Sequence, residues 1–195
     1  RHIAPDLAPE PGERVFDASG CHVTPGFIES HTHFDGTMWW QPDMDPLPGY
    51  GVTTTIMGNC GFSAAPVHED PKVRGEMVYI FSFFEDIPEK PFLKELPWDW
   101  RSWSEYRRST SRVKTAANFG AFVGHIAIRL AAMGLAAWER SATPEEIARM
   151  ADMLDDALGA GAMGLSTNFL DHDGNDRPVP TLLADDAEFS ALLDV

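Results

Sequence analysis

The sequence predicts an α/β fold with a parallel sheet, and two observations carry this prediction. Short apolar segments rich in β-branched residues alternate along the chain with segments of helical periodicity, and this order is typical of right-handed βαβ units. Such units form either a doubly wound sheet or a (β/α)₈ barrel, which typically needs about 250 residues. The chain has 195 residues, 44% of them hydrophobic, which is enough for one packed core and for about the first half of a barrel.

The first elements of the chain are predicted to be short strands. Residues 1–12 are rich in proline and acidic side chains and show no periodicity, so we expect an irregular lead-in. Segments 15–17 and 21–30 are apolar and β-leaning, but Ser-Gly and Pro-Gly pairs interrupt them. We therefore expect two short strands here, or one strand broken by turns, ending at His31.

Further buried strands are predicted downstream. Residues 52–57 are β-branched and lie between two glycines, and segments 119–123 and 162–167 are apolar with glycines beside or within them. Residues 62–112 interrupt the alternation with an insert rich in tryptophan and phenylalanine. We expect this aromatic insert to be either a lid or a packed subdomain that covers the barrel end.

Two helices are predicted from their capping residues. Thr143 and Glu146 form a capping box before a run with helical spacing. Asp185, with Glu188 three positions later, opens a second helical run that has not stopped at Val195. From this run, and from a first residue that is not methionine, we expect the chain to be part of a longer protein.

The composition argues against several classes of function. The formal net charge of −15 would repel phosphate backbones, so we expect no nucleic-acid partner. Since no apolar run approaches the ~20 residues of a membrane-spanning helix, we expect no membrane partner. Two cysteines, Cys21 and Cys60, are too few for a disulfide framework and suit a reduced protein, which makes a cytoplasmic location the expectation.

The most informative segment is PGFIESHTHFD, residues 25–35. Side chains at positions i and i+2 of a strand share one face, so His31 and His33 can place two imidazole nitrogens about 2.0–2.1 Å from one zinc ion. Alone, a His-x-His pair is more often two surface or core histidines than a metal site. Its position favours a site, because active sites of parallel α/β sheets lie beyond the carboxyl ends of the strands.

Two further candidate residues follow later strands. Cys60 lies in MGNCG, directly after the 52–57 strand, where a thiolate is a suitable zinc ligand and the glycines allow a sharp turn. Alone, it would more often be an inert buried thiol. His125 follows the 119–123 strand, and it is equally compatible with a metal ligand and with a substrate-contacting or structural histidine. His172 is most simply a loop histidine.

Taken together, these segments resemble the amidohydrolase superfamily and, within it, the N-acyl-D-amino-acid deacylases (D-aminoacylases). The resemblance covers nearly the whole chain and includes VFDASG leading into VTPGFIE, the HTH motif, GVTT followed by GNCG, the GH pair at residue 124, and GAMGLST. In that family His31 and His33 correspond to metal ligands. Cys60 corresponds to the cysteine that replaces, in the deacylases, the metal-bridging carboxylated lysine used elsewhere.

The resemblance implies a specific architecture. The chain would be the first half of a metal-dependent hydrolase-type TIM barrel, preceded by a short remnant of a small β-sandwich. Residues 1–22 would be the irregular lead-in and the end of the β-sandwich segment. Residues 23–195 would be a partial barrel domain carrying the aromatic insert at about 62–112.

The resemblance also implies a function. With Zn²⁺ held by His31, His33 and Cys60, the longer protein would hydrolyse the amide bond of a small-molecule N-acyl-D-amino acid. The family's catalytic aspartate would lie beyond Val195, so this piece would contain no catalytic residue of that kind, would be inactive alone and would tend to self-associate, while His125 would contact substrate. The alternatives are another amidohydrolase, such as a cyclic-amide hydrolase or a deaminase, and a catalytically silent fragment or interaction domain. Residues 167–172 depart from the tyrosine-containing stretch of the deacylases, which leaves the D-side chain open.

Overall fold

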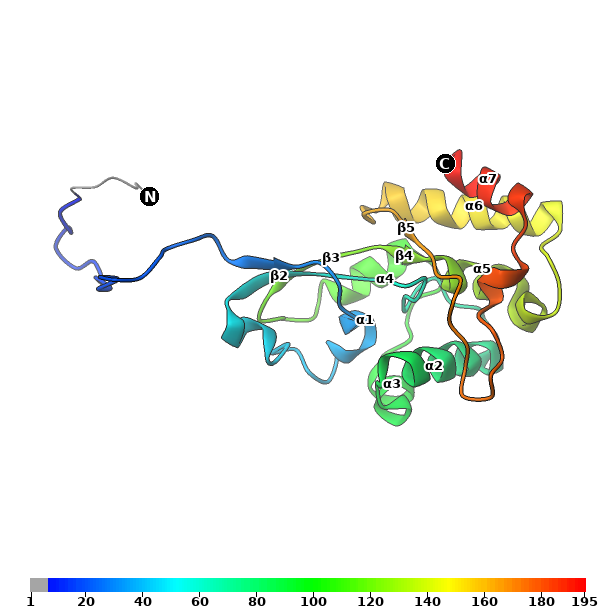
Figure 1. The fold of residues 1–195 in the computed structure, drawn as a ribbon, viewed down its shortest axis with the longest axis horizontal. Coiled ribbons are helices and arrows are strands. Elements are labelled where there is room, and N and C mark those ends of the chain that lie inside the picture. Colours follow the sequence, from blue (N-terminus) through cyan, green and yellow to red (C-terminus); the bar gives the residue numbers. More distant parts are fainter. Residues whose placement is uncertain (1–6) are drawn as a thin grey trace.

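The computed structural model describes residues 7–195, and the described part is an α/β structure (Figure 1). Its strands are β1 (Phe27–Glu29), β2 (Val52–Met57), β3 (Asn118–Ala121), β4 (Val123–Gly124) and β5 (Leu165–Ser166). Its α-helices are α1 (Phe34–Thr37), α2 (Pro71–Glu85), α3 (Glu89–Glu95), α4 (Trp103–Thr110), α5 (His125–Met133), α6 (Pro144–Gly159) and α7 (Asp186–Leu193). Short 3-10 helices are η1 (Leu47–Tyr50), η2 (Gly134–Trp138) and η3 (Pro180–Leu183).

The strands pair in parallel, as the alternation of strands and helices predicts. β2 lies between β1 and β3, and β4 pairs with β5. Only Phe122 separates β3 from β4, and its backbone N–H donates to the Met57 carbonyl at 2.9 Å. The two ladders therefore form one strand series, which is consistent with part of a barrel.

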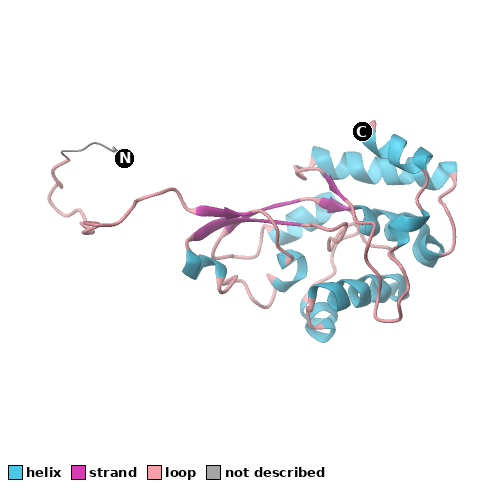
Figure 2. Cartoon of the chain, in the orientation of Figure 1, coloured by secondary structure: helices cyan, strands magenta, loops and turns pink. Residues whose placement is uncertain are grey.

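Helices cover both sides of these strands. Figure 1 shows α6 and α7 on one side and α2 and α3 on the other, and Figure 2 shows the strands between these layers. The predicted helix after Thr143 is confirmed as α6, with both hydrogen bonds of the capping box to Glu146. The helix opened by Asp185 is confirmed as α7, and it ends at Leu193. None of the helices among the described residues is long and apolar enough to cross a membrane.

The aromatic insert is packed into the core. Phe62 stacks on Phe81 with ring centroids 5.4 Å apart, and Phe92 meets Phe81 edge-on at 5.2 Å. The buried Trp100 donates its indole N–H to the Ala64 carbonyl at 2.8 Å. Burying one such side chain stabilises a fold by about 1.5–3 kcal/mol. Of the two expectations for residues 62–112, the packed subdomain is therefore the one that the structure supports.

The prediction of a strand in segment 15–17 is wrong, and of the predicted segment 21–30 only Phe27–Glu29 forms a strand, β1. Residues 7–26 form no strand, and Val15, Phe16 and Val23 are 68%, 72% and 85% exposed. β-branched and aromatic residues favour a strand only where a neighbouring strand supplies hydrogen bonds and packing, and no described residue does so here. The β-sandwich remnant is not confirmed, and the division at residue 22 stays a prediction. Residues 1–6 of the lead-in lie outside the described residues.

Candidate metal centre

His31 and His33 are placed by the residue between them. The backbone N–H of Thr32 donates to the Ile56 carbonyl at 2.9 Å, and its hydroxyl donates to the same carbonyl at 2.8 Å. The hydroxyl also lies 2.7 Å from Thr55 Oγ1. Thr32 therefore fixes the segment after β1 against β2. Because side chains alternate along an extended segment, the two histidines point away from that contact together.

Cys60 is held by a tight turn directly after β2. Gly58, Cys60 and Gly61 all have positive φ, of 75°, 54° and 76°, a conformation that is uncommon for any residue with a side chain. A Cβ atom at Gly58 would lie 2.2 Å from the Phe122 carbonyl oxygen, so only glycine fits. The Asn59 amide donates to the Thr32 carbonyl at 3.3 Å and joins this turn to the histidine segment. The turn thus presents Cys60 beside the two histidines.

The structure brings the three predicted metal ligands together. One ligand atom from each of His31, His33 and Cys60 lies within 4.8 Å of the others, and His31 Nε2 lies 3.1 Å from Cys60 Sγ. Both ring nitrogens of His33 are buried, and neither has a hydrogen-bond partner among residues 7–195, which is costly unless a ligand satisfies them. Two imidazoles and a thiolate form a donor set that zinc prefers. The residues therefore fit a zinc ion.

The protonation of His33 suits a cation, whereas that of Cys60 would have to change when a cation binds. Burial, and secondarily the nearby His31, lower the pKa of His33 to about 4, so its ring is neutral as metal binding requires. Burial, followed by the charges of Glu85 and Asp171, raises the pKa of Cys60 to about 11. A cation bound here would favour the Cys60 thiolate in two ways. Its positive charge would offset the nearby acidic side chains, and its bond to sulfur would replace the hydration that burial removes.

Glu85 is a residue of this site that the sequence does not reveal. Its Oε1 lies 3.2 Å from His33 Nε2. Burial, and then the charge of Asp171, raise the pKa of Glu85 to about 7. His33 and Glu85 line the same open hollow of about 320 Å³. Glu85 belongs to the aromatic insert, and no local pattern indicates that α2 returns to a histidine 52 positions earlier in the chain.

Asp35 supports the site from within the core. It is completely buried, and its Oδ2 accepts a hydrogen bond from the Gly58 backbone N–H at 3.1 Å. Burial raises the pKa of Asp35 to about 7. The backbone carbonyl of Asp35 accepts a hydrogen bond from the Tyr106 hydroxyl at 2.8 Å. Asp35 therefore links α1, which directly follows His33, to both the Cys60 turn and α4.

His125 does not join the three-residue cluster. It opens α5 and is completely buried, with Nε2 donating to Glu188 Oε1 at 2.8 Å. Its Nδ1 lies 3.3 Å from Thr181 Oγ1. Glu188 also accepts from the buried Arg129, so both of its carboxylate oxygens are paired. The structure thus satisfies both ring nitrogens with protein groups. A contact of His125 with substrate stays a prediction.

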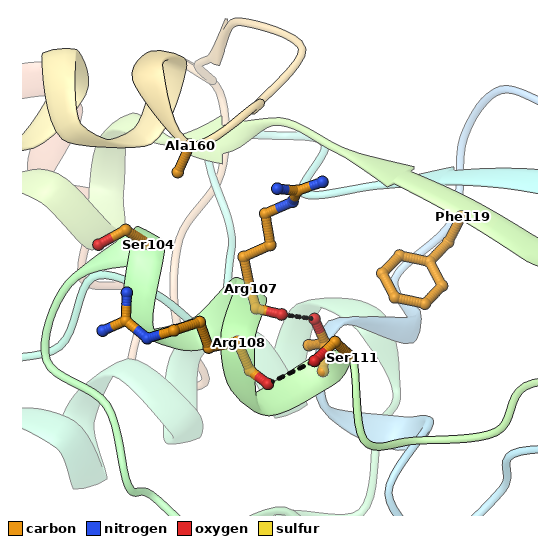
Figure 3. Close-up of a pocket in the computed structure, with 7 residues that line it drawn as sticks. Ser104, Arg107, Arg108, Ser111, Phe119 and Ala160 are labelled. Carbon is orange, nitrogen blue, oxygen red and sulfur yellow. Dashed lines mark hydrogen bonds between the residues drawn. The ribbon is translucent and has the colours of Figure 1, made fainter.

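A larger hollow than the one beside His33 lies elsewhere in the described part of the chain. It measures about 510 Å³ and is lined by residues of α4, β3 and the end of α6. Figure 3 shows the Arg107 guanidinium between Ala160 and Phe119, and the Arg108 side chain extending toward Ser104. None of the predicted site residues lines this hollow. Volume alone therefore does not locate the functional site of this chain.

A histidine pair and a cysteine lie at the carboxyl ends of neighbouring parallel strands, as expected for a metal-dependent hydrolase of the amidohydrolase family. The sequence profile of the amidohydrolase family matches residues 14–188, and the chain belongs to this family. The family resemblance predicted from the HTH and GNCG motifs is thereby confirmed.

Within the family, the chain is similar to deacylases of D-amino-acid derivatives. It is 37% identical over 164 residues to an N-acyl-D-aspartate deacylase of Alcaligenes xylosoxydans xylosoxydans, covering 83% of this chain and 30% of that protein. It is 35% identical over 168 residues to a D-aminoacylase of the same organism, with the same coverage of 83% and 30%. The chain thus spans less than a third of the length of these relatives.

The chain is also similar to a solved structure of a deacylase. The crystal structure of an N-acyl-D-glutamate deacylase from Bordetella bronchiseptica, complexed with zinc and a phosphonate inhibitor, superposes with a TM-score of 0.64 at 31% identity. The match covers 86% of this chain and 31% of that one. This likeness supports the α/β fold and its reading as part of a barrel.

Proposed function

We propose that the protein carrying this chain hydrolyses the N-acyl amide bond of N-acyl-D-amino acids, giving a carboxylate and a D-amino acid. Zinc would be held by His31, His33 and Cys60. The single observation that carries the proposal is the convergence of three ligand atoms within 4.8 Å of one another. The relatives named as deacylases of D-amino-acid derivatives, at 35–37% identity, support the choice of substrate.

The residues of the chain have defined tasks in this reaction. When bound, zinc would polarise the acyl carbonyl as a Lewis acid and would lower the pKa of a water molecule to about 7. His31 and His33 bind as neutral imidazoles, and Cys60 binds after losing its proton. Thr32 and the Gly58 turn keep these side chains in fixed positions, because each is hydrogen-bonded to the neighbouring strand or to Asp35.

Other parts of the proposal rest on the family. The proton-shuttling aspartate is expected beyond Val195, and His125 is proposed to support substrate binding. From its place in the fold, His125 would act through Thr167, whose Oγ1 lies 3.4 Å from His125 Nδ1. A small-molecule N-acyl-D-amino acid is the proposed partner. Cytoplasmic location and self-association of the piece stay predictions.

A turnover assay on the longer protein tests this function. The zinc-loaded protein is supplied with N-acetyl-D-amino acids, their L enantiomers and a cyclic amide, and the release of amine or ring-opened product is followed. We expect release of amine from the D substrates and much less from the L substrates. Turnover of the cyclic amide alone would contradict the proposal and favour a cyclic-amide hydrolase, and no turnover of any substrate would favour a catalytically silent protein.

A further inference from the structure

We propose that Glu85, from the aromatic insert, is a further protein ligand of the metal centre, binding through Oε1 beside His33. This inference rests on the proposed metal site at His31, His33 and Cys60 and adds a fourth protein group to it. None of the motifs that indicate the site includes Glu85, so the argument depends on its contacts, its charge and its place at the end of α2.

The distances suit two ligands of one ion. Bonds of about 2.0–2.1 Å at tetrahedral angles place neighbouring ligand atoms about 3.3 Å apart. Glu85 Oε1 lies 3.2 Å from His33 Nε2, and Cys60 Sγ lies 3.1 Å from His31 Nε2. The Glu85–His33 pair thus has the spacing of adjacent donors, while the nitrogen and sulfur of His31 and Cys60 lie closer than about 3.6 Å, the separation that a zinc–sulfur bond of about 2.3 Å would give. Glu85 lies on the His33 side of the three-residue cluster and outside the group of atoms within 4.8 Å of one another, so its side chain would have to rotate to bind an ion there.

The contact between Glu85 and His33 is not a hydrogen bond. The two atoms are close enough for one, yet His33 Nε2 has no hydrogen-bond partner, because the carboxylate lies out of line with the ring nitrogen. A carboxylate that only oriented the ring would be expected to accept its N–H directly, as in carboxylate–histidine–zinc arrangements. The observed offset favours two donors that face a common ion.

The charge of Glu85 lacks a compensating partner. Its side chain is 18% exposed and that of His33 is 11% exposed, so water reaches the pair poorly. Among the described residues, no lysine or arginine forms an ion pair with Glu85, and Asp171 adds a like charge. A largely buried carboxylate without a cation is costly. A divalent ion at His33 would remove that cost.

The position of Glu85 at the C-terminus of α2 does not stabilise the helix. It is the last residue of α2 and is followed by Asp86, while the last turn contains no basic residue. Acidic side chains at a helix C-terminus oppose the helix dipole. One turn earlier on the same face, Phe81 contacts the His33 ring edge-on at 5.7 Å. Helix α2 therefore packs on His33 with Phe81 and presents the carboxylate of Glu85 to it.

Cobalt binding by the chain tests this proposal without an activity readout. The chain, Glu85→Gln and Cys60→Ser are titrated with Co²⁺, with affinity measured by competition against a chelating dye and coordination followed by the visible and thiolate-to-cobalt absorption bands. We expect Glu85→Gln to weaken Co²⁺ binding by about tenfold or more. Its thiolate band should persist at saturation, while the visible bands change because one oxygen donor is lost.

The matched control is Glu89→Gln, which removes the same charge four residues later from an exposed position in α3. It should bind Co²⁺ within about twofold of the unchanged chain, since it lies outside the site. Glutamine keeps the size of Glu85, so a purely packing role would leave affinity and spectrum unchanged in Glu85→Gln. That result would overturn the proposal.

Further outcomes separate this inference from the proposed function. Loss of the thiolate band in Cys60→Ser, together with unchanged binding in Glu85→Gln, would refute Glu85 alone. No thiolate band in the unchanged chain would refute both proposals. If circular dichroism shows that Glu85→Gln does not fold, Glu85→Asp decides, because its shorter side chain keeps the charge but reaches less far. Several-fold weaker binding by Glu85→Asp would support the proposal, and unchanged binding would overturn it.

Discussion

Two histidine clusters in this molecule follow different strands, β1 and β4, and differ in how their histidine rings are paired with protein groups. Around His125, Glu188 and Arg129 neutralise each other's charge, and each ring nitrogen faces a protein group. Around His33, both ring nitrogens lack a hydrogen-bond partner, and the adjacent Glu85 has no basic partner among the described residues.

The difference separates a histidine whose ring is held by protein groups from one whose ring is not. Burial, despite the adjacent Glu188, lowers the pKa of His125, while hydrogen bonds from His125 and Arg129 outweigh burial and lower the pKa of Glu188. The histidine and the carboxylate of the first cluster are therefore paired with protein groups, although Arg129 Nε has no partner among the described residues, and the cluster connects α5 to α7. In the second cluster protein groups leave the His33 ring unpaired, and its donor set is one that zinc prefers. The unpaired ring nitrogens, more than the presence of histidine, favour His33 over His125 as a metal ligand.

The largest expected effect comes from the metal cluster. In the longer protein, Cys60→Ala should reduce turnover by several orders of magnitude, because a lost ligand removes the activated water, and should leave the fold largely intact. Amine release from an N-acetyl-D-amino acid measures the first effect and circular dichroism the second. Cys21→Ala is the control, since that free cysteine is exposed. Activity of Cys60→Ala within a few-fold of the unchanged protein would show that Cys60 is only a core residue.

The cluster of His125, Glu188 and Arg129 should instead affect the free energy of unfolding. Glu188→Ala leaves the fully buried Arg129 and His125 without their carboxylate, and breaking such a pair typically costs about 3–5 kcal/mol. Urea denaturation of the chain measures the loss. Asp186→Ala, on an exposed position of the same helix, should change stability by about 0.5 kcal/mol or less. Equal stabilities of the two variants would refute the structural role of the His125 cluster.

Zinc should stabilise the chain only through the cluster of His31, His33 and Cys60. At a free zinc concentration of about 100 times Kd, ligand linkage predicts about 2.7 kcal/mol of stabilisation. Differential scanning fluorimetry should show a rise in Tm that is reversed by a chelator. The rise should be absent in Cys60→Ala and retained in Asp186→Ala. A zinc-dependent rise of equal size in Cys60→Ala would place the ion elsewhere.

The smallest effect is expected for an ion pair between the buried Glu146 and an exposed arginine, Arg140. Hydrogen bonding to Arg140, opposed by burial and reinforced by the Thr143 backbone N–H, lowers the pKa of Glu146 from 4.5 to about 2. Its stabilising effect is therefore complete above pH 4.5 and lost as the pH falls toward about 2. Glu146→Gln should cost about 1 kcal/mol at neutral pH and little at pH 2. A cost that does not change with pH would contradict this assignment.

Local signals predicted much of the fold. β2 was expected at residues 52–57 because β-branched residues lie between two glycines, and the structure has it at those residues. Thr143 and Glu146 predicted the start of α6 because a capping box is a contact within one turn. The strands expected near Val15 and Val23 are absent, because pairing depends on a partner strand that the local sequence does not specify.

The candidate site, like the fold, could be predicted in part from local sequence signals. His31, His33 and Cys60 follow β1 and β2, so strand direction alone brings them to one edge. Glu85 was not predictable, because its contact with His33 depends on how the insert packs. In the sequence Glu188 matches a capping residue, and only the tertiary structure shows that its side chain binds His125 instead.

X-ray absorption at the zinc edge of the zinc-loaded chain tests the central claim most directly. If His31, His33 and Cys60 bind the ion, the spectrum should contain one sulfur at about 2.3 Å together with nitrogen or oxygen donors at about 2.0–2.1 Å. The sulfur shell should disappear in Cys60→Ala and remain in Cys21→Ala. Zinc surrounded only by nitrogen and oxygen in the unchanged chain, or a sulfur shell that persists in Cys60→Ala, would contradict the account.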